Sequence, residues 1–477
     1  MQRIGHRAAW LIAGALAAGI PALWMRGFTV DDALISVRYA HHLASGTGWR
    51  FNAGGPSTDG VTPLPWPLIL VPFARADALV VLGRAQTLGL AAWTIAAGAL
   101  GLAVGGREGA PVWARAGALS TMALSLPVAA HAVSGMETSI ATALATAAAL
   151  LARRPRLAAI VAGLAASLRP EMVAWACVLA MGLAIAKRRD DVAGALLGTA
   201  LAAAPFVVCA LLRLASWGRA APLSLLAKPS DLSHGLAYVG AACVVTIVPI
   251  LAVAPLALRR VPEAMAIVAA FLAHAATVIA AGGDWMPFAR LMVPVVPTLV
   301  WAFVLASTRA HRAATAARLV LATSVAVFLI SRYGWSCRPP AHDVGSDRAA
   351  LIAAARPWLK PLRRVAALDI GWVGAATDAD IIDLAGVTDP EIAVLPGGHT
   401  SKRVDAMLLL TRGADGLFLY APRGLPSGGL NQWRAIAWSR AVEARLGDDD
   451  VIAHHFAPAA WLPLGPSGAG YVLLRVP

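Results

Sequence analysis

Long apolar runs separated by short polar connections dominate the chain up to about residue 331. Several runs approach the ~20 residues with which an α-helix crosses the hydrocarbon core of a bilayer, and the shorter ones need flanking residues to do so. The pattern predicts eleven membrane helices, near residues 8–25, 85–104, 116–133, 138–152, 157–168, 172–186, 192–212, 236–258, 264–281, 291–308 and 314–331.

Two apolar stretches, 63–82 and 8–25, differ from ordinary membrane-crossing runs or resemble other kinds of segment. Segment 63–82 contains several prolines together with Arg75 and Asp77, which favours an interfacial helix over a crossing. The first run, 8–25, is not followed by an A-x-A cleavage pattern, so we expect it to be retained as a helix.

Composition agrees with a membrane protein. Of the 477 residues, 58% are hydrophobic and 14% are charged, whereas soluble domains carry about 25% charged residues. The formal net charge of +14 is explained by where the charges lie and does not call for a nucleic-acid partner.

The distribution of basic residues predicts the orientation. Cytoplasmic connections carry more Lys and Arg than outer ones, and this is satisfied when the N-terminus is cytoplasmic. The inner connections then hold Arg3, Arg7, Arg107, Arg115, Arg153, Arg154, Arg156, Lys187, Arg188, Arg189, Arg259, Arg260, Arg309, Arg312 and Arg318, against Arg169, Arg213, Arg219, Lys228 and Arg290 outside.

The tail differs from the rest of the chain. It gains Asp, Gly and Pro, and its β-prone runs are Val365–Ile370, Ile381–Leu384, Leu417–Tyr420 and Tyr471–Val476, with a helical pattern at Leu430–Leu446. We therefore predict a polytopic α-helical protein of the cytoplasmic (inner) membrane. Its transmembrane domain is 1–331, with the first outer loop at 26–84, and a small extracytoplasmic α/β domain follows at 332–477.

Adjacent carboxylates at Asp31 and Asp32 follow the first membrane helix. Ionisable groups at such a place indicate function when they line a polar cavity. The alternative is structural: Asp31 caps a helix that starts near Ala33, and Asp32 complements the positive end of that helix.

Further polar clusters fall in outer turns. Each has a structural alternative: an acid that begins a helix (Glu137), ion pairs across turns (Arg169 with Glu171, and Asp284 with Arg290), an interfacial indole (Trp285) or a headgroup anchor (Lys228). Together, outer-facing acids, bases and an aromatic suit a lipid-phosphate substrate. Arg and Lys would hold the phosphate, and a carboxylate would take the proton of an attacking hydroxyl.

These motifs resemble those of the GT-C glycosyltransferases, most closely the bacterial branch that contains the mycobacterial terminal β-(1→2)-arabinofuranosyltransferase. The matching segments are Asp31-Asp32-Ala33 with Arg38-Tyr39-Ala40, Gly46 to Gly54, Asp59 to Trp66, Ser134 to Thr138, Leu168 to Glu171, Ala227-Lys228-Pro229, Gly282 to Met286 with Arg290, Asp383 to Pro390, and His399 to Arg403. Departures are Pro222 to Leu226, which lacks the Asn-Thr pair usual there, and Val61 in place of an aromatic.

The resemblance implies an integral-membrane transferase that uses a polyprenyl-phosphate sugar, a pentofuranose among the candidates, and a cell-envelope glycan or glycolipid acceptor. It implies Asp31 as the base, with Asp32 as a supporting carboxylate or cation ligand at the donor phosphate, and no certain cofactor or resident metal. The implied substrate-binding residues are Arg38, Tyr39, Asp59, Glu137, Arg169, Glu171, Lys228, Asp284, Trp285, Arg290 and His399.

Two other functions fit the same features. A transporter or flippase for a lipid-linked sugar would also bind phosphate, but it would need charges deep inside the helices, where this sequence has few. A non-catalytic glycan-binding membrane protein would need only the outer domain, and the Asp31–Asp32 pair argues against it.

Overall fold

The computed structural model of this chain describes residues 2–188 and 191–477, and it describes side chains outside residues 2–4 and 334–340. Arg189 and the side chain of Arg3, which contributed to the predicted orientation, lie outside this description. The described chain is mostly helical, with a five-stranded sheet near its C-terminus.

The chain forms two compact units. Met1–Phe28, Arg84–Leu211 and Ser230–His342 form one, here called the membrane unit; Thr29–Gly83, Leu212–Pro229 and Asp343–Pro477 form the other, here called the sheet unit. This division follows packing and not position in a bilayer, so the predicted boundary between a transmembrane domain and an outer domain stays a prediction.

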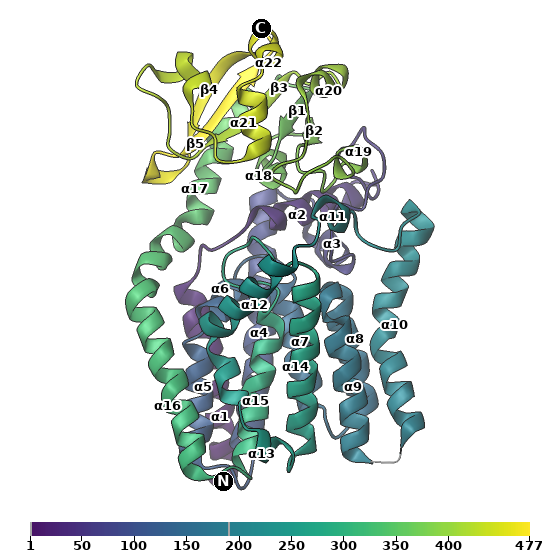
Figure 1. Cartoon of the computed structure of the whole chain (residues 1–477), viewed down its shortest axis with the longest axis vertical. Coiled ribbons are helices and arrows are strands. Elements are labelled where there is room, and N and C mark those ends of the chain that lie inside the picture. The colour runs from purple at the N-terminus through teal and green to yellow at the C-terminus, as the bar shows by residue number, and fades with distance from the viewer. Residues whose placement is uncertain (1, 189–190) are drawn as a thin grey trace. The chain divides into compact units, whose positions relative to one another are not determined.

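Helices account for most of the membrane unit (Figure 1). Among the described residues, six helical segments are long and apolar enough to cross a membrane. They are Gly5–Trp24 of α1 (Gln2–Trp24), Ala78–Gly105 (α4), Pro170–Lys187 with α9 (Val173–Lys187), Val192–Trp217 (α10), Pro262–Ala280 (α14) and Arg312–Tyr333 with α16 (Arg312–Leu329). Four shorter apolar helical stretches accompany them in the described chain: Thr138–Leu150 (α7), Pro155–Leu168 (α8), Leu232–Thr246 (α12) and Val293–Ser307 with α15 (Val296–Ser307).

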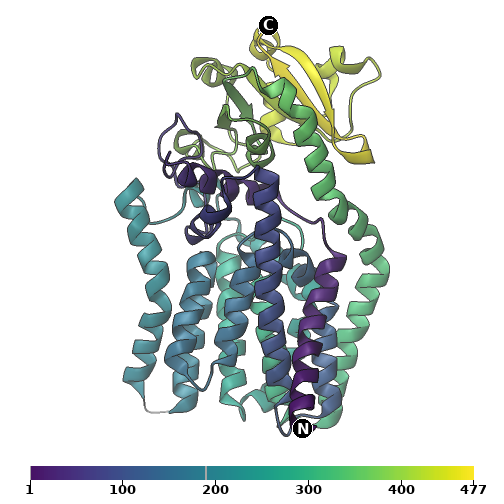
Figure 2. The same cartoon turned by 180° about the vertical axis from the view of Figure 1, so that it is seen from behind.

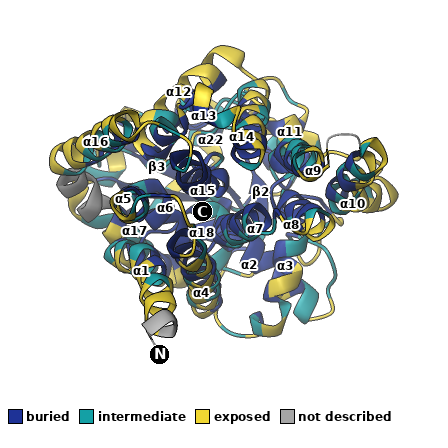
Figure 3. Cartoon of the chain, turned by 90° about the horizontal axis from the view of Figure 1, so that it is seen from below, coloured by how far each residue is buried: buried dark blue, intermediate teal, exposed yellow. Residues whose placement is uncertain are grey.

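The outer faces of these helices are apolar. Leu16 and Ile20 of α1, Leu196 of α10 and Phe328 of α16 are all more than half exposed, and exposed residues follow the periphery of the helices in Figure 3. Contiguous apolar surface of this kind is unfavourable in water and favourable in lipid. The chain is therefore a multi-pass membrane protein.

Close helix contacts in the membrane unit depend on small residues. A Cβ added to Gly14 would lie 2.2 Å from the carbonyl oxygen of Ala97, and one added to Gly101 would lie 2.2 Å from that of Trp10. The backbones of α1 and α4 can approach this closely only because both positions are glycine. Figure 2 shows the two helices side by side.

Every predicted membrane helix contains helical structure, but two are interrupted. Run 116–133 is divided at Ser125 between α5 (Val112–Ala123) and α6 (Leu126–Ala132). Run 236–258 ends its first helix at Ile247, whose φ is +68°, and continues as the 3₁₀ turn Val248–Ala252 and α13 (Pro255–Leu258). Prolines at 127 and 249 explain why neither helix continues.

The sheet has the strand order β2-β1-β3-β5-β4, with bounds Asp380–Asp383, Arg364–Ala367, Gly416–Ala421, Gly470–Arg475 and Ala457–Pro463. β1 pairs in parallel with β2 and β3, and β5 pairs antiparallel with β3 and β4. Four strands were predicted from β-prone runs. The run over β4 was missed because it is an edge strand with prolines at both ends and an irregular register near Pro458.

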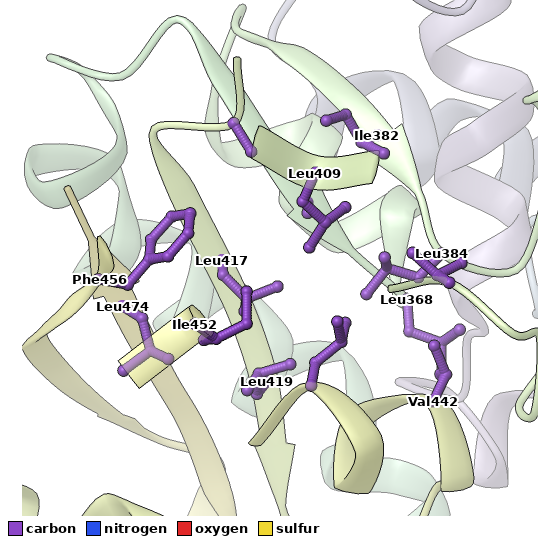
Figure 4. Packing of buried hydrophobic residues seen from close by; sticks show 14 of the residues in the cluster. Leu368, Ile382, Leu384, Leu409, Leu417, Leu419, Val442, Ile452, Phe456 and Leu474 are labelled. Atoms are coloured by element: carbon purple, nitrogen blue, oxygen red, sulfur yellow. The ribbon is translucent and has the colours of Figure 1, made fainter. Parts of the chain in front are cut away.

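Side chains of alternating strand positions form two cores, one on each face of the sheet. Leu417 and Leu419 belong to one core (Figure 4). Phe418 belongs to the other, together with residues of the first loop, among them Tyr39 and Phe51. The segment predicted as an outer loop is thus part of the sheet unit, and α2 (Asp31–Ala44) is one of the elements that cover the sheet.

We predict that Phe51→Ala destabilises the sheet unit. Phe51 is 1% exposed, and its ring lies 5.1 Å from the Arg38 guanidinium and 5.9 Å from the ring of Tyr39, so its loss should cost about 3–5 kcal/mol. Urea unfolding of the detergent-solubilised full chain, followed by tryptophan fluorescence, measures this cost. Val394→Ala, at a 69% exposed position, is the control, and equal midpoints for the two variants would contradict the prediction.

Candidate functional site

Asp31 lies at the first position of α2 but does not cap that helix. The N-cap is Val30, and no side chain caps the helix there. The Asp31 carboxylate instead accepts hydrogen bonds from the backbone N–H groups of Gly371 (2.9 Å) and Trp372 (2.7 Å), in the first turn of α18 (Ile370–Ala376). The prediction that Asp31 caps the helix was wrong, because the helix begins at Asp31 itself and not near Ala33.

A second carboxylate, Asp369, comes just after β1 and carries its own counterion. Both of its oxygens accept from the Arg440 guanidinium, at 2.9–3.0 Å. The Tyr471 hydroxyl donates to it at 2.5 Å, and Arg348 donates to the oxygen of that hydroxyl at 2.7 Å. The bidentate contact with Arg440 stabilises the ionised form of Asp369.

The pKa values of the two carboxyl groups are shifted in opposite directions. Burial alone would raise the pKa of Asp369, but the charge of Arg440 lowers it below its ordinary value. Burial, followed by the negative charge of Asp369, raises the pKa of Asp31 to about 8, and the N–H donors of Gly371 and Trp372 offset this only in part. Asp31 therefore exchanges its proton near neutral pH while Asp369 stays ionised.

Glu443, at the other side of Arg440, completes the network. The Arg440 Nε donates to one of its oxygens at 2.7 Å, and the Tyr420 backbone N–H donates to the other at 3.0 Å. Burial raises the pKa of Glu443 to about 7, because it outweighs the opposing charge of Arg440.

This arrangement equips Asp31 for proton transfer. A carboxylate offers about four acceptor positions, and two are used by the backbone, while the side chain stays partly exposed. A general base works best with a pKa near the operating pH. Asp32 is adjacent, and its charge also raises the pKa of Asp31.

Arg38 and Tyr39, both predicted to bind substrate, are buried in the sheet unit. The Arg38 guanidinium donates to the carbonyl oxygens of Phe51, Gly374, Thr377 and Ala379 at 2.7–2.9 Å. The Tyr39 hydroxyl contacts Thr58 and accepts from the Gly60 N–H. The Arg38 contacts join the first loop to the end of α18, whereas those of Tyr39 stay within the loop. A substrate role for either residue stays a prediction.

Asp59 forms a buried ion pair with Arg213. The Arg213 Nε donates to its carboxylate at 2.8 Å, and both side chains are 2% exposed. Arg213 also donates to the carbonyl oxygen of Thr62 at 2.6 Å. The pair joins the first loop to the segment Leu212–Pro229, a partnership that the sequence separation of 154 residues concealed.

Lys228 and His399 follow two short helices of the sheet unit that pack against each other. Lys228 ends α11 (Leu223–Ala227), and His399 follows α19 (Pro390–Ala393). α11 and α19 pack through a small apolar cluster that includes Leu223 and Ala393. Both predicted binding residues are partly exposed.

In the membrane unit, Arg169 lies between two predicted acids. Its guanidinium contacts Glu137 at 2.7 Å and Glu171 at 2.9 Å, with Glu137 fully buried. The Nη2 of Arg169 and the Oε2 of Glu137 are buried without a hydrogen-bond partner. Buried charges with unmet hydrogen-bonding capacity are unusual and point to a polar site.

Asp284 and Arg290 pair in the same unit, as the structural alternative predicted. The Arg290 Nε and Nη2 both lie 2.8 Å from one oxygen of Asp284, and Trp285 is 49% exposed beside them. His274 links this segment to the Arg169 cluster, because one ring nitrogen contacts the carbonyl oxygen of Leu291 (2.7 Å) and the other that of Glu171 (3.2 Å).

The loop that carries Asp284 is strained. Gly282 and Gly283 have φ of +85° and +73°, and the non-glycine residues Phe288 and Ala289 also have positive φ, at +61° and +51°. Strain of this kind persists where the surroundings hold the backbone, which is frequent at functional sites.

Asp31 belongs to the sheet unit, and Arg169 and Arg290 belong to the membrane unit. The prediction that they line one cleft therefore stays a prediction. Among the described residues, no group of three or more His, Cys, Asp or Glu side chains is placed to hold a metal ion.

Sequence reasoning missed the charged network beside Asp31, which consists of Asp369, its partners Arg440 and Tyr471, and Arg348, which contacts Tyr471. One signal was present. Asp369 lies near the carboxyl end of the β-prone run Val365–Ile370, and the observed strand β1 ends two residues before it. β1 is parallel to both of its neighbours, and sites in open α/β sheets lie beyond the carboxyl ends of such strands. Arg440 and Tyr471 are distant in sequence and carry no comparable signal.

One comparison with known proteins gives a match. Residues 344–458 match a family described as a domain of unknown function (DUF8728); this part of the sheet unit runs from α17 (Trp335–Leu359) into β4. No curated protein and no solved structure matches the chain.

We predict a carboxyl group in this site that titrates near pH 8. Infrared difference spectra of the protein across pH should show a protonated carboxyl band that disappears as pH rises past that value. Asp31→Asn should remove the band, and Asp369→Asn should move its midpoint to lower pH, because the neighbouring negative charge is lost. A wild-type spectrum without such a band would contradict the assignment.

We predict that Glu443 makes stability fall with rising pH. Its folded pKa, about 7, is above its ordinary value of 4.5, so the folded state binds more protons between these values. Its contribution is full below about 4.5 and is lost as pH rises through 7. Glu443→Gln should flatten the unfolding free energy over this window, as measured by urea titrations at several pH values. An unchanged slope would show that Glu443 does not titrate there.

Proposed function

We propose that this protein is a GT-C type glycosyltransferase that moves a sugar, a pentofuranose among the candidates, from a polyprenyl-phosphate donor to a cell-envelope glycan or glycolipid. The observation that carries the proposal is Asp31, a partly exposed carboxyl held by two backbone N–H groups, whose pKa is raised to about 8. The motif resemblance that begins at Asp31 supports the same assignment.

The proposed topology has eleven crossings of the cytoplasmic membrane, with the N-terminus inside and the sheet-bearing C-terminal region outside. The positive-inside distribution supports this orientation. Nucleotide sugars are absent from the outer face, so a transferase working there needs a donor carried across on lipid.

In the proposed reaction, an acceptor hydroxyl gives its proton to the Asp31 carboxylate. The hydroxyl oxygen forms a bond to the anomeric carbon, and the bond from that carbon to the phosphate oxygen breaks. Polyprenyl phosphate leaves with the bonding electrons, and the anomeric centre inverts. Every atom is accounted for without a cofactor, and no step depends on a cation.

The remaining predicted residues take supporting parts. Arg169, Arg290 and Lys228 are proposed to bind the donor phosphate, for which guanidinium and ammonium groups are suited. Asp32 is proposed as a supporting carboxylate beside the base or as a cation ligand at the donor phosphate. Glu137, Glu171, Asp284, Trp285 and His399 are proposed to shape the sugar and acceptor pocket. Unmet hydrogen-bonding capacity at Arg169 and Glu137 supports their inclusion.

We predict that Asp31→Asn lowers turnover by about 10²–10⁴-fold, the usual contribution of a general base. Release of polyprenyl phosphate from a panel of lipid-phosphate sugars, in liposomes containing purified protein, measures turnover. Asp378→Asn, at an exposed aspartate of the same unit, is the matched control and should stay close to wild type.

The pH dependence of turnover is a second test of the role of Asp31. Because Asp31 acts as a base, turnover should rise as pH increases through about 8. Wild-type turnover by Asp31→Asn, or loss of turnover in Asp378→Asn to the same extent, would refute the role of Asp31.

A further inference from the structure

A separate cavity of about 480 Å³ lies within the membrane unit, here called the arginine pocket. It forms where α4 ends at Gly105, α9 ends at Lys187, α14 begins at Pro262 and α15 ends at Ser307. Three arginines line it, together with Glu108, Glu263 and Thr308; the arginines are Arg107, Arg260 and Arg309. None of them takes part in the reaction proposed above.

The arginine pocket carries one more positive than negative charge, because three arginines and two glutamates line it. No ion pair between Arg107, Arg260 or Arg309 and another described residue is present, although two glutamates line the same cavity. The Nε of Arg107 is buried without an acceptor. Because a buried donor is costly when unpaired, an acceptor bound beside Arg107 would lower this cost.

The helix dipoles favour two of the three arginines at their positions but not the third. Arg107 and Arg309 follow the carboxyl ends of α4 and α15, where basic residues are favourable. Arg260 precedes the amino end of α14, where the helix dipole favours an anion instead. An anion placed in the cavity would be stabilised both by that helix end and by the three guanidinium groups.

Exposed apolar side chains lie close in sequence to the lining residues, on the same helices. Leu102 of α4, Ile185 of α9 and Met265 of α14 are 36%, 43% and 47% exposed, and each lies within about five residues of a lining residue. A ligand with an anionic head and apolar tails would satisfy both the guanidinium groups and these side chains. Basic pockets between membrane helices bind lipid headgroups in this way.

We infer that the arginine pocket binds the phosphate headgroup of an anionic membrane phospholipid. The site is independent of Asp31 and of the proposed glycosyl transfer.

Native mass spectrometry of the full chain in non-ionic detergent tests this inference, with phosphatidylglycerol, phosphatidylcholine and soluble glycerol phosphate as probes. Phosphatidylglycerol should bind about tenfold more tightly than phosphatidylcholine. The double variant Arg260→Gln/Arg309→Gln should lose about tenfold or more of this affinity, the equivalent of one charge-assisted hydrogen bond. Arg156→Gln, at an exposed arginine of α8 outside the pocket, should change it less than about twofold.

A variant of opposite sign separates binding from misfolding. Glu263→Gln removes a negative charge that lines the pocket, so it should tighten phosphatidylglycerol binding, a gain that a damaged fold would not give. Equal affinity for the two lipids, equal losses in the double variant and Arg156→Gln, or displacement of the lipid by glycerol phosphate at the same concentration would each overturn the inference.

Discussion

One electrostatic constraint determines the character of the sheet unit: two carboxyl groups share a buried environment, and arginine neutralises only one of them directly. Asp369 takes the bidentate contact with Arg440 and the hydroxyl of Tyr471. Within the described chain, the donors to Asp31 are two backbone N–H groups, and its carboxyl is exposed to the charge of Asp369. Because the two negative charges repel in a low dielectric, one carboxyl stays ionised and the other exchanges its proton near neutral pH.

The same contacts explain why the first loop folds with the tail. Asp31 engages the start of α18 and Arg38 engages its end, so both ends of one short helix are tied to α2. The sequence predicted strands and the acidic pair from local periodicity and composition. It could not predict that 29–83 packs on the sheet, because pairings separated by more than 300 residues leave no local periodic signal.

In the membrane unit, every predicted apolar run contains a helix, and six described helical segments are long and apolar enough to cross a membrane; eleven crossings stay a prediction. The helical runs were recognised, and the pairs Arg169–Glu171 and Asp284–Arg290 formed as charge complementarity suggested. The breaks near Ser125 and Ile247 were missed because runs 116–133 and 236–258 stay apolar over their whole length although they contain prolines. The helix-terminal arginines predicted only the orientation of the chain. Their arrangement around one cavity could not be predicted, because it depends on tertiary packing.

The central claim is that Asp31 touches the reacting hydroxyl. An experimental structure of the full chain in a lipid bilayer, with a non-transferable phosphonate analogue of the polyprenyl-phosphate sugar and an acceptor bound, tests it most directly. The account predicts an acceptor hydroxyl within hydrogen-bonding distance of an Asp31 carboxylate oxygen, on the face of the sugar opposite the phosphonate. A sugar bound away from Asp31, with that carboxylate contacting only Gly371 and Trp372, would contradict it.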